Sequence, residues 1–299
     1  MLKSFAEIHD RVKGAARRRL AVAGAAHPHT LQAVSQAHGA GLVDALLFGP
    51  AGEIEAAARK AEVDLSPFEV RDVTGDAETA AAAVEAVRSG EAGMLMKGSV
   101  PTGVTLRAVL DKQMGLRSGE LLSHIACLEV PGHDRLIWVT DGGLNIRPDQ
   151  PTKAEILANA VNALHRLGYE RPNVAVLAAV EEVNPDMPET LDAAALAQMG
   201  ERGQFGACEV DGPLALDLAV NAEAARIKGV ESPVAGKADI LLVPDIHVGN
   251  IFAKGLIYLG GAKVGGMVAG ATAPVVLLSR ADTTETKLNS IALCTAAAG

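Results

Sequence analysis

The sequence is poor in aromatic residues, which make up only 3% of its 299 residues. Hydrophobic residues nevertheless account for 49%, so Ala, Val, Leu and Ile must fill the core. With 21% charged residues, the composition is that of a globular protein and not of a disordered one. The length is compatible with one large α/β domain or with two modest ones.

Cysteine is scarce and long hydrophobic runs are absent. Cys127, Cys208 and Cys294 are far apart and form no C-x-x-C motif, which is typical of buried thiols in a cytosolic protein. No apolar run reaches the roughly 18 residues that a membrane-spanning helix needs. The first 19 residues are polar and lack the apolar region of a signal peptide. We therefore predict a cytoplasmic protein without a membrane partner.

Basic residues are outnumbered by acidic ones. The chain has 27 Lys and Arg residues against 36 Asp and Glu residues, a formal net charge of −9. Nucleic acids bind basic protein faces, so we predict no nucleic-acid partner. A small anionic ligand is compatible with this charge, because a few Arg and Lys side chains can form a local positive pocket.

Short hydrophobic runs alternate with helical segments in the first part of the chain. Apolar runs without polar alternation, separated by helices, are typical of strands that are buried on both faces of a parallel sheet. The expected strands are residues 20–24, 43–48, 68–73 and 92–96, and the expected helices are residues 5–12, 27–38, 53–61, 77–88 and 104–110.

The pattern changes near residue 116. Two apolar runs, 123–130 and 136–140, flank polar turn residues and predict a β-hairpin. Alternation then resumes, with expected strands at 174–179, 207–210, 239–243 and 274–278, expected helices at 153–166, 188–198, 214–228, 251–259 and 283–297, and a Gly-rich segment at 260–273. We predict a first α/β domain of residues 1–122, completed by about 275–299, and a second of residues 123–274.

Polar residues follow the expected strand 274–278, and ligands of open α/β sheets bind at the carboxyl ends of strands. The segment Ser279-Arg280-Ala281-Asp282 is the sharpest signal, because Arg280 offers a planar fork for phosphate oxygens. Asp282 has an alternative role, since residues 282–285 resemble a capping box before the last helix.

A second candidate anion site follows the expected strand 92–96. Lys97 and Thr102 supply donors, Gly98 permits a close backbone approach, and the following helix N-terminus favours an anion. An ordinary turn with Thr102 as helix N-cap explains the same residues. Arg107, one turn further along, is either a phosphate ligand or a solvated side chain.

Three other segments lie at ends of expected strands and have structural alternatives. Ser123-His124 begins the hairpin, where a serine is more often structural. Residues 140–145 form either a site loop or a turn in which Asp141 bonds its own backbone. The segment 181–185, which begins with Glu181 and Glu182, either binds a metal or is a solvated acidic loop. The chain has no G-x-S-x-G elbow, which argues against a hydrolase triad.

Together these segments resemble the phosphate acetyl/butyryltransferase family, and the butyryltransferases more than the acetyltransferases, from about residue 20 to the end. The motifs that carry the resemblance are Leu95-Met96-Lys97-Gly98, residues 115–119 with Ser123-His124, Thr140-Asp141 with Asn145-Ile146, residues 153–156, residues 211–217, residues 243–246 with Gly249-Asn250, and Ser279-Arg280-Ala281-Asp282. The resemblance implies transfer of a butyryl or similarly short acyl group between CoA and inorganic phosphate. It also implies a two-domain, parallel-sheet-based α/β fold like that of the isocitrate and isopropylmalate dehydrogenases, with the site in the cleft between the domains.

The resemblance also assigns roles to residues. Ser279 and Arg280 match the catalytic Ser-Arg pair that handles the acyl phosphate. Thr286 stands where the acetyltransferases carry the Asp proposed as base for the CoA thiol, so Asp282 or Glu285 takes that role here, or the thiolate forms without a base. His247 and Pro101 are further departures from the butyryltransferases. The expected substrate-binding residues are Lys97, Thr102, Arg107, Ser123, Asn145, Asp245 and Asn250, with Asp245 orienting the others.

The implied reaction needs no metal and no bound cofactor, because CoA is a substrate and donors aimed at the developing charge suffice. One rival function is a metal-dependent dehydrogenase of the same fold, which requires a cluster of acidic or His ligands. The other is a regulatory protein that binds CoA or acyl phosphate without turnover. A homodimer through the Ala-rich helices 189–198 and 214–228 is expected, because small side chains allow close packing across an isologous interface.

Overall fold

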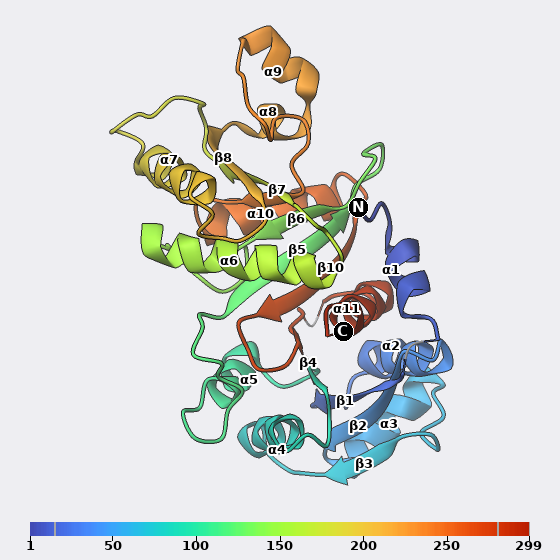
Figure 1. The fold of residues 1–299 in the computed structure, drawn as a ribbon. Helices are drawn as coiled ribbons and strands as arrows, with labels where there is room; N and C mark the ends of the chain where they lie inside the picture. Colours follow the sequence, from blue (N-terminus) through green and yellow to red (C-terminus); the bar gives the residue numbers. More distant parts are fainter. Residues whose placement is uncertain (15, 280, 299) are drawn as a thin grey trace. The chain divides into compact units, whose positions relative to one another are not determined.

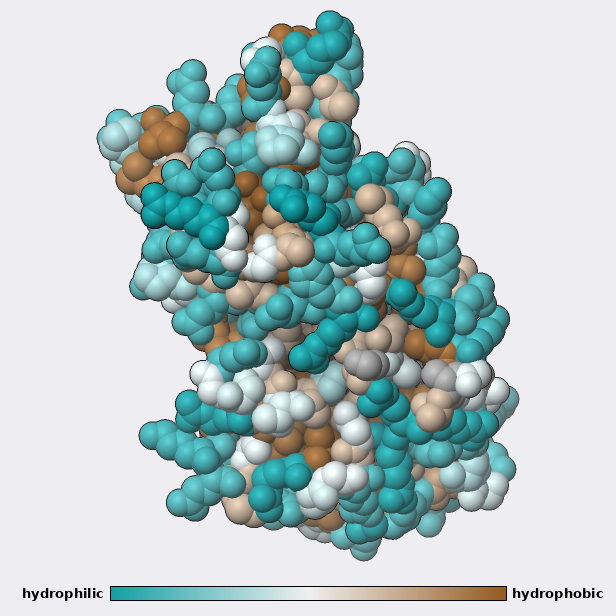
Figure 2. Space-filling view, viewed as in Figure 1, coloured by the Kyte–Doolittle hydropathy of each residue, from teal (hydrophilic) through white to brown (hydrophobic). Residues whose placement is uncertain are grey.

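The computed structural model describes residues 1–14, 16–279 and 281–298, and it divides into two compact units (Figure 1). Unit 1 comprises Met1–Ser4 and Leu121–Val264, and unit 2 comprises Phe5–Glu120 and Gly265–Gly299. Among the described residues, no helix has both the length and the hydropathy that crossing a membrane requires. The face of the molecule in Figure 2 is largely hydrophilic, with hydrophobic surface in separate spots.

Unit 2 contains a parallel sheet with the strand order β3-β2-β1-β4-β11. Its strands are β1 (Arg18–Ala23), β2 (Val43–Gly49), β3 (Glu69–Asp72), β4 (Met94–Lys97) and β11 (Val275–Val276). β10 (Lys263–Ala269) enters the unit at Gly265 and pairs antiparallel with β11. The apolar runs therefore predicted the parallel strands of this unit correctly.

The helices of unit 2 are α1 (Phe5–Val12), α2 (Pro28–Gly39), α3 (Ala51–Ala61), α4 (Asp76–Arg88), α5 (Thr102–Val109) and α11 (Thr284–Ala297). The last helix, α11, packs against α1 and α2, while α4 packs against α5 and β1. The buried residues of α4 include several alanines, such as Ala80 and Ala83. Small side chains allow close approach, which explains how a core with few aromatics is filled.

The Gly-rich segment 260–273 was not predicted to contain a strand, yet it forms β10. Val268 pairs with Val275 of β11, and Met267 and Val268 are buried. Gly265 lies against the ring of Phe5 and the backbone of Asn289, and a Cβ there would come within 2.9 Å of the ring. The glycine that weakens strand propensity is thus required by tertiary packing.

Unit 1 contains the strand order β5-β6-β9-β7-β8. β5 (Ser123–Glu129) and β6 (Ile137–Thr140) form the predicted antiparallel hairpin. β9 (Ile240–Leu242), β7 (Asn173–Leu177) and β8 (Glu209–Leu214) continue the sheet in parallel from β6. The helices are α6 (Gln150–Arg166), α7 (Pro188–Glu201), α8 (Leu216–Val220), α9 (Ala222–Lys228) and α10 (Ile246–Tyr258).

The single helix predicted at 214–228 is wrong. Leu214 ends β8, and the helical part is divided at Asn221, which has extended backbone angles and accepts hydrogen bonds from Glu223 N and Ala224 N as the N-cap of α9. An Asn side chain that bonds to nearby backbone N–H groups competes with helix continuation.

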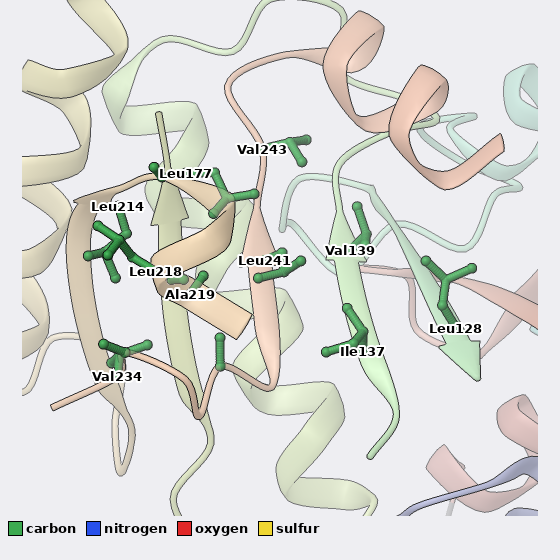
Figure 3. Packing of buried hydrophobic residues seen from close by; sticks show 14 of the residues in the cluster. Leu128, Ile137, Val139, Leu177, Leu214, Leu218, Ala219, Val234, Leu241 and Val243 are labelled. Atoms are coloured by element: carbon green, nitrogen blue, oxygen red, sulfur yellow. The ribbon is translucent and has the colours of Figure 1, made fainter. Parts of the chain in front are cut away.

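The core of unit 1 lies along one face of its sheet (Figure 3). Ile137 and Val139 of β6 and Leu241 of β9 contribute to this face. Trp138 lies between Ile137 and Val139 on the strand, so its side chain points to the opposite face. There it is fully buried, with its ring edge-on to Tyr169 at 6.2 Å between centroids.

Asp239, directly before β9, is a buried carboxylate. Its Oδ2 accepts hydrogen bonds from the backbone N (2.9 Å) and the Nδ2 (3.3 Å) of Asn173. Its Oδ1 has no hydrogen-bond partner in the described part of the chain. Burial raises the pKa of Asp239 above its ordinary value of 3.8, although the hydrogen bonds from Asn173 and the charge of Arg135 oppose the rise.

We expect Asp239→Asn to remove a pH dependence of stability. A carboxyl whose pKa is raised by folding contributes stability that is fully present below its unfolded pKa and is lost as pH rises through its folded pKa. The free energy of unfolding is measured in urea at several values from about pH 4 to pH 7. As the pH rises, it should fall more in the wild-type protein than in Asp239→Asn. Identical pH profiles for the two proteins would contradict this expectation.

Candidate functional site

The loop after β6 in unit 1 is organised by the carboxylate of Asp141, which is 2% exposed. Oδ1 accepts from the backbone N of Gly143 (2.8 Å) and Leu144 (2.9 Å). Oδ2 accepts from Asn145 N (3.3 Å), Asn145 Nδ2 (2.7 Å) and His124 N (3.1 Å). The alternative that Asp141 bonds its own backbone is thus confirmed, and the carboxylate fixes Asn145 next to it.

Asn145 is a partly exposed side chain with a fixed orientation. Its amide nitrogen donates to Asp141 and to the backbone oxygen of Leu122 (2.9 Å). Because both bonds use the nitrogen, the amide oxygen Oδ1 is the acceptor that Asn145 can offer to a ligand.

Asp245 and Asn250 lie at the first turns of α10, next to this loop. The Asp245 carboxylate caps the helix by accepting from the backbone N of His247 (2.8 Å) and Val248 (3.0 Å). Asn250 Nδ2 donates to the backbone oxygen of Gly142 (3.3 Å). β6 and β9 are adjacent parallel strands, so their carboxyl ends bring these residues together with Asn145.

Glycines at two positions allow this contact between the loop and α10. A Cβ on Gly249 would lie 2.7 Å from the Cα of Gly142, and one on Gly142 would lie 2.8 Å from the carbonyl carbon of Gly249. Two backbones meet here without side chains between them. The cap by Asp245 also explains why α10 begins at Ile246, earlier than the predicted residue 251.

A cavity of about 350 Å³ borders Asp245 in unit 1. Its walls are largely apolar, with Leu177, Val243 and Phe252 among them, and Glu189 adds a second carboxylate. Two carboxylates at its border disfavour a phosphate group inside this cavity.

Ser123, at the first position of β5, is completely buried. Its Oγ accepts a hydrogen bond from Asn159 Nδ2 (3.0 Å), which also donates to the backbone oxygen of Leu121 (2.7 Å). These bonds connect the start of β5 to α6. The Ser123 hydroxyl therefore faces the interior of unit 1 in this structure.

In unit 2, Lys97 ends β4 and is 3% exposed, and its Nζ donates to the backbone oxygen of Gly98 (3.0 Å). A Cβ on Gly98 would lie 2.0 Å from the backbone oxygen of Gly24, so no other residue fits. The close backbone approach expected at Gly98 is thus made by Gly24, at the end of β1. Gly98 N and Ser99 N bond to the oxygens of Ala23 (2.8 Å) and Gly24 (2.7 Å).

Thr102 and Arg107 are exposed residues of α5. The alternative of Thr102 as N-cap is wrong: Pro101 is the N-cap, and Thr102 is the first helical residue. Arg107 lines a hollow of about 520 Å³ between α4 and α5, together with Glu85 and Asp111. Thr102 and Arg107 thus lie on the helix that follows Lys97.

Ser279 is exposed and begins a tight turn before α11. Its backbone N donates to Asp282 Oδ2 (2.7 Å), and its Oγ accepts from Ala281 N (3.3 Å). Accepting this bond uses a lone pair and not the O–H, so the hydroxyl keeps its proton as a donor. Arg280 lies outside the described residues.

The expectation that Asp282 caps the last helix is wrong. Thr283 is the N-cap of α11, with its Oγ1 accepting from Thr286 N (3.1 Å). Thr283, one residue later in the sequence, supplies the capping oxygen, and the Asp282 carboxylate bonds Ser279 N instead. The carboxylate therefore holds the turn that carries Ser279.

Lys287 of α11 also contacts this turn and was missed in the sequence. It is 3% exposed, and its Nζ donates to the backbone oxygen of Asp282. The available signal was a lysine four residues before Ile291, which places both residues on one face of the expected helix 283–297. Within residues 1–14, 16–279 and 281–298, no group of three His, Cys, Asp or Glu residues is arranged to hold a metal ion.

Comparisons with known proteins cover nearly the whole chain. The family model described as phosphate acetyl/butaryl transferase matches residues 71–295. The phosphate butyryltransferase of Clostridium acetobutylicum is 48% identical over 299 residues, which are 100% of this chain and 99% of the relative. A phosphate acetyltransferase of Thermotoga maritima is 42% identical over 276 residues, covering 92% of this chain and 94% of the relative. The crystal structure of a branched-chain phosphotransacylase from Enterococcus faecalis superimposes with a TM-score of 0.84 at 34% identity, covering 94% of this chain and 99% of that chain.

Proposed function

The chain belongs to the phosphate acetyl/butaryl transferase family, and we propose that it transfers a butyryl or similarly short acyl group between CoA and inorganic phosphate. The observation that carries the proposal is the 48% identity to a phosphate butyryltransferase over the full length of both chains. The matched residues 71–295 include every candidate site residue from Lys97 to Asp282. The dehydrogenase alternative is not favoured, since the relatives reported above are transferases.

The proposed reaction is a displacement at an acyl carbon. In the direction of CoA acylation, the CoA sulfur attacks the carbonyl carbon of the acyl phosphate, and negative charge develops on the carbonyl oxygen. The bond to the phosphate oxygen then breaks and phosphate leaves, while the thiol proton passes to a base or to the phosphate. Donors fixed in advance around the carbonyl and phosphoryl oxygens stabilise this charge.

We propose that the residues of unit 2 bind the phosphoryl group. Ser279 offers a hydroxyl proton, and the bond from Ala281 N occupies only a lone pair of its oxygen. Arg280 offers a fork of donors for phosphate oxygens. Lys97 adds a cation at the end of β4, and Thr102 and Arg107 add donors on α5.

In unit 1 we propose that Asn145 and Asn250 contact substrate directly. Asp245 acts through α10, because its carboxylate is used in capping the helix. Ser123 is fully buried, so its proposed contribution is to hold β5 in place through Asn159.

We also propose that the two units are the domains of an isocitrate/isopropylmalate dehydrogenase-like protein. Each unit is compact and has its own set of strands and helices, which supports the proposal of two domains. The first domain would then contain the N-terminal α/β segment and the returning C-terminal strand and helix, as the sequence predicts.

Release of CoA from acyl-CoA tests the proposed function. We expect phosphate-dependent release of CoA thiol from butyryl-CoA, with lower rates from acetyl-CoA, and unchanged rates in EDTA, because the proposed groups are donors to anions. Binding of acyl-CoA without thiol release would instead indicate a regulatory protein. Loss of turnover in EDTA that a divalent cation restores would overturn the metal-free mechanism.

Asp282→Asn tests whether Asp282 is the base. The Asn oxygen can still accept from Ser279 N, so a positioning role predicts turnover within a few-fold of wild type. A general base predicts a loss of roughly 10²-fold or more. We expect the smaller effect, because the carboxylate is already bonded within the turn. A large loss of turnover at an unchanged melting temperature would establish Asp282 as the base.

We further propose a cytoplasmic homodimer. The three cysteines are unpaired and buried, as is usual for proteins of a reducing compartment. Exposed apolar side chains on α7 and α9, Leu191 (45% exposed) and Ile227 (71%), support an interface there. Light scattering at micromolar concentration should give the mass of two chains, and the mass of one chain would refute the dimer.

A further inference from the structure

Lys287 is an unusual lysine, because side chains of this type are almost never buried unless they are paired. It lies in the first turn of α11 and is 3% exposed. Its Nζ donates to a neutral group, the backbone oxygen of Asp282. Among the described residues, no carboxylate forms an ion pair with it.

The chain has a second buried lysine, Lys153, whose charge is paired with a carboxylate of the protein itself. Lys153 of unit 1 is 5% exposed, and its Nζ lies 2.7 Å from Asp192 Oδ2. That ammonium is neutralised within the fold. Lys287 Nζ has no such carboxylate at ion-pair distance among the described residues, although the negative charge of Asp282 favours its charged form.

Burial lowers the pKa of Lys287, although the charge of Asp282 opposes the shift. Burying a charge that the fold does not pair costs free energy. Such a cost is commonly retained at functional sites, where a ligand supplies the missing partner.

The position of Lys287 indicates which ligand this is. It bonds the turn of residues 279–282, whose Ser279 hydroxyl proton is available to donate. β4 and β11 are parallel neighbours with Met96 opposite Val276, so Lys97 ends one strand where the other leads into Ser279. Lys97 and Lys287 are therefore two buried cations on different elements, and both lie near the carboxyl ends of β4 and β11 in unit 2.

We propose that Lys287 is a positioning residue of a phosphate site at the Ser279–Asp282 turn. It holds the turn through the Asp282 carbonyl, and it supplies a buried positive charge that the bound phosphoryl group neutralises. The inference rests on the proposed acyl transfer and identifies inorganic phosphate, or the phosphoryl end of the acyl phosphate, as the group bound there. The phosphates of CoA share this chemistry, so the experiment must separate the two sources.

Two variants test the role of the positive charge of Lys287. Lys287→Met removes both the charge and the hydrogen bond, while Lys287→Gln keeps a donor for the carbonyl and removes only the charge. Lys153→Met changes the net charge equally in unit 1 and serves as the matched control. Each protein is melted in increasing inorganic phosphate and, separately, in increasing CoA, and KM values for phosphate and for butyryl-CoA are measured.

In the wild-type protein, phosphate should raise the melting temperature because it binds the folded state. In both Lys287 variants we expect the half-saturating phosphate concentration and the KM for phosphate to rise about tenfold or more, as for the loss of a charged partner. The response to CoA and the KM for butyryl-CoA should change less than about twofold. Lys287→Met should melt no lower than wild type without phosphate, since it removes an unpaired buried charge. Lys153→Met should melt lower and keep the phosphate response.

A lower melting temperature of both Lys287 variants with an unchanged phosphate response would overturn the proposal, because it marks a merely structural lysine. Loss of the CoA response instead of the phosphate response would overturn it too, since the charge would then serve CoA. If Lys153→Met lost the phosphate response as strongly as the Lys287 variants, the cause would be the change in net charge. That result would also overturn the proposal. Absence of CoA release by the wild-type protein would refute the proposed function, whereas the melting response to phosphate tests Lys287 without turnover.

Discussion

Replacing Arg280 by alanine is expected to lower turnover by roughly 10²- to 10³-fold, the usual scale for removing one preorganised donor to developing charge. Arg280 lies outside the described residues, and the expectation follows from its neighbours. Ser279 has a hydroxyl proton available to donate, and the carboxylate of Asp282 holds the turn from the other side. A guanidinium group can form two parallel hydrogen bonds to phosphate oxygens.

Arg280→Lys is the matched variant, because it keeps the charge and loses the bidentate fork. It should recover part of the lost turnover, with a KM for phosphate between those of the wild type and Arg280→Ala. We expect neither change to lower the melting temperature appreciably, so that a loss of turnover can be assigned to the site. Near-normal turnover and phosphate KM in Arg280→Ala would place the phosphate site elsewhere.

Asp141→Ala is expected to cause the largest loss of stability, about 3 kcal/mol or more. The buried carboxylate accepts five hydrogen bonds from the N–H groups of His124, Gly143, Leu144 and Asn145. Alanine leaves these donors without a partner and releases the side chain of Asn145. Urea unfolding should show the lower free energy, and turnover should fall in the fraction that remains folded.

Asp149→Ala is a control for the removal of a capping carboxylate from the same unit. Asp149 is exposed and accepts from Thr152 N (3.0 Å) at the start of α6. Its loss should cost only about 1 kcal/mol, the usual value for an N-cap. Similar losses of unfolding free energy in Asp141→Ala and Asp149→Ala would contradict the organising role of Asp141.

Patterns of apolar residues predicted most elements correctly, because burial on both faces of a parallel sheet leaves continuous hydrophobic runs. The residues of β2 and β4 are examples, with β4 buried throughout. Prediction was wrong where a local signal competed with tertiary packing. β10 was missed because its glycines weaken strand propensity, yet Gly265 is required by the ring of Phe5.

The same distinction applies to the candidate site. The motifs at the ends of expected strands identified Lys97, Asn145, Asp245, Asn250 and Ser279 as candidates. They did not distinguish a side chain that offers a free group from one already used within the fold. Ser123 is buried against Asn159, Asp245 caps α10, and Thr283 rather than Asp282 caps α11.

By itself, the sequence determined the class of fold and the polar residues at the carboxyl ends of its strands, because both depend on residues that are close together along the chain. It also carried the motifs of the family to which the chain belongs. Only the tertiary structure decided how these polar groups are used, since hydrogen-bond partners such as Asp141 with His124, or Lys287 with the turn at Ser279, are set by packing. The sequence alone does not tell a buried lysine from an exposed one, because burial depends on which elements pack around the side chain and exclude water.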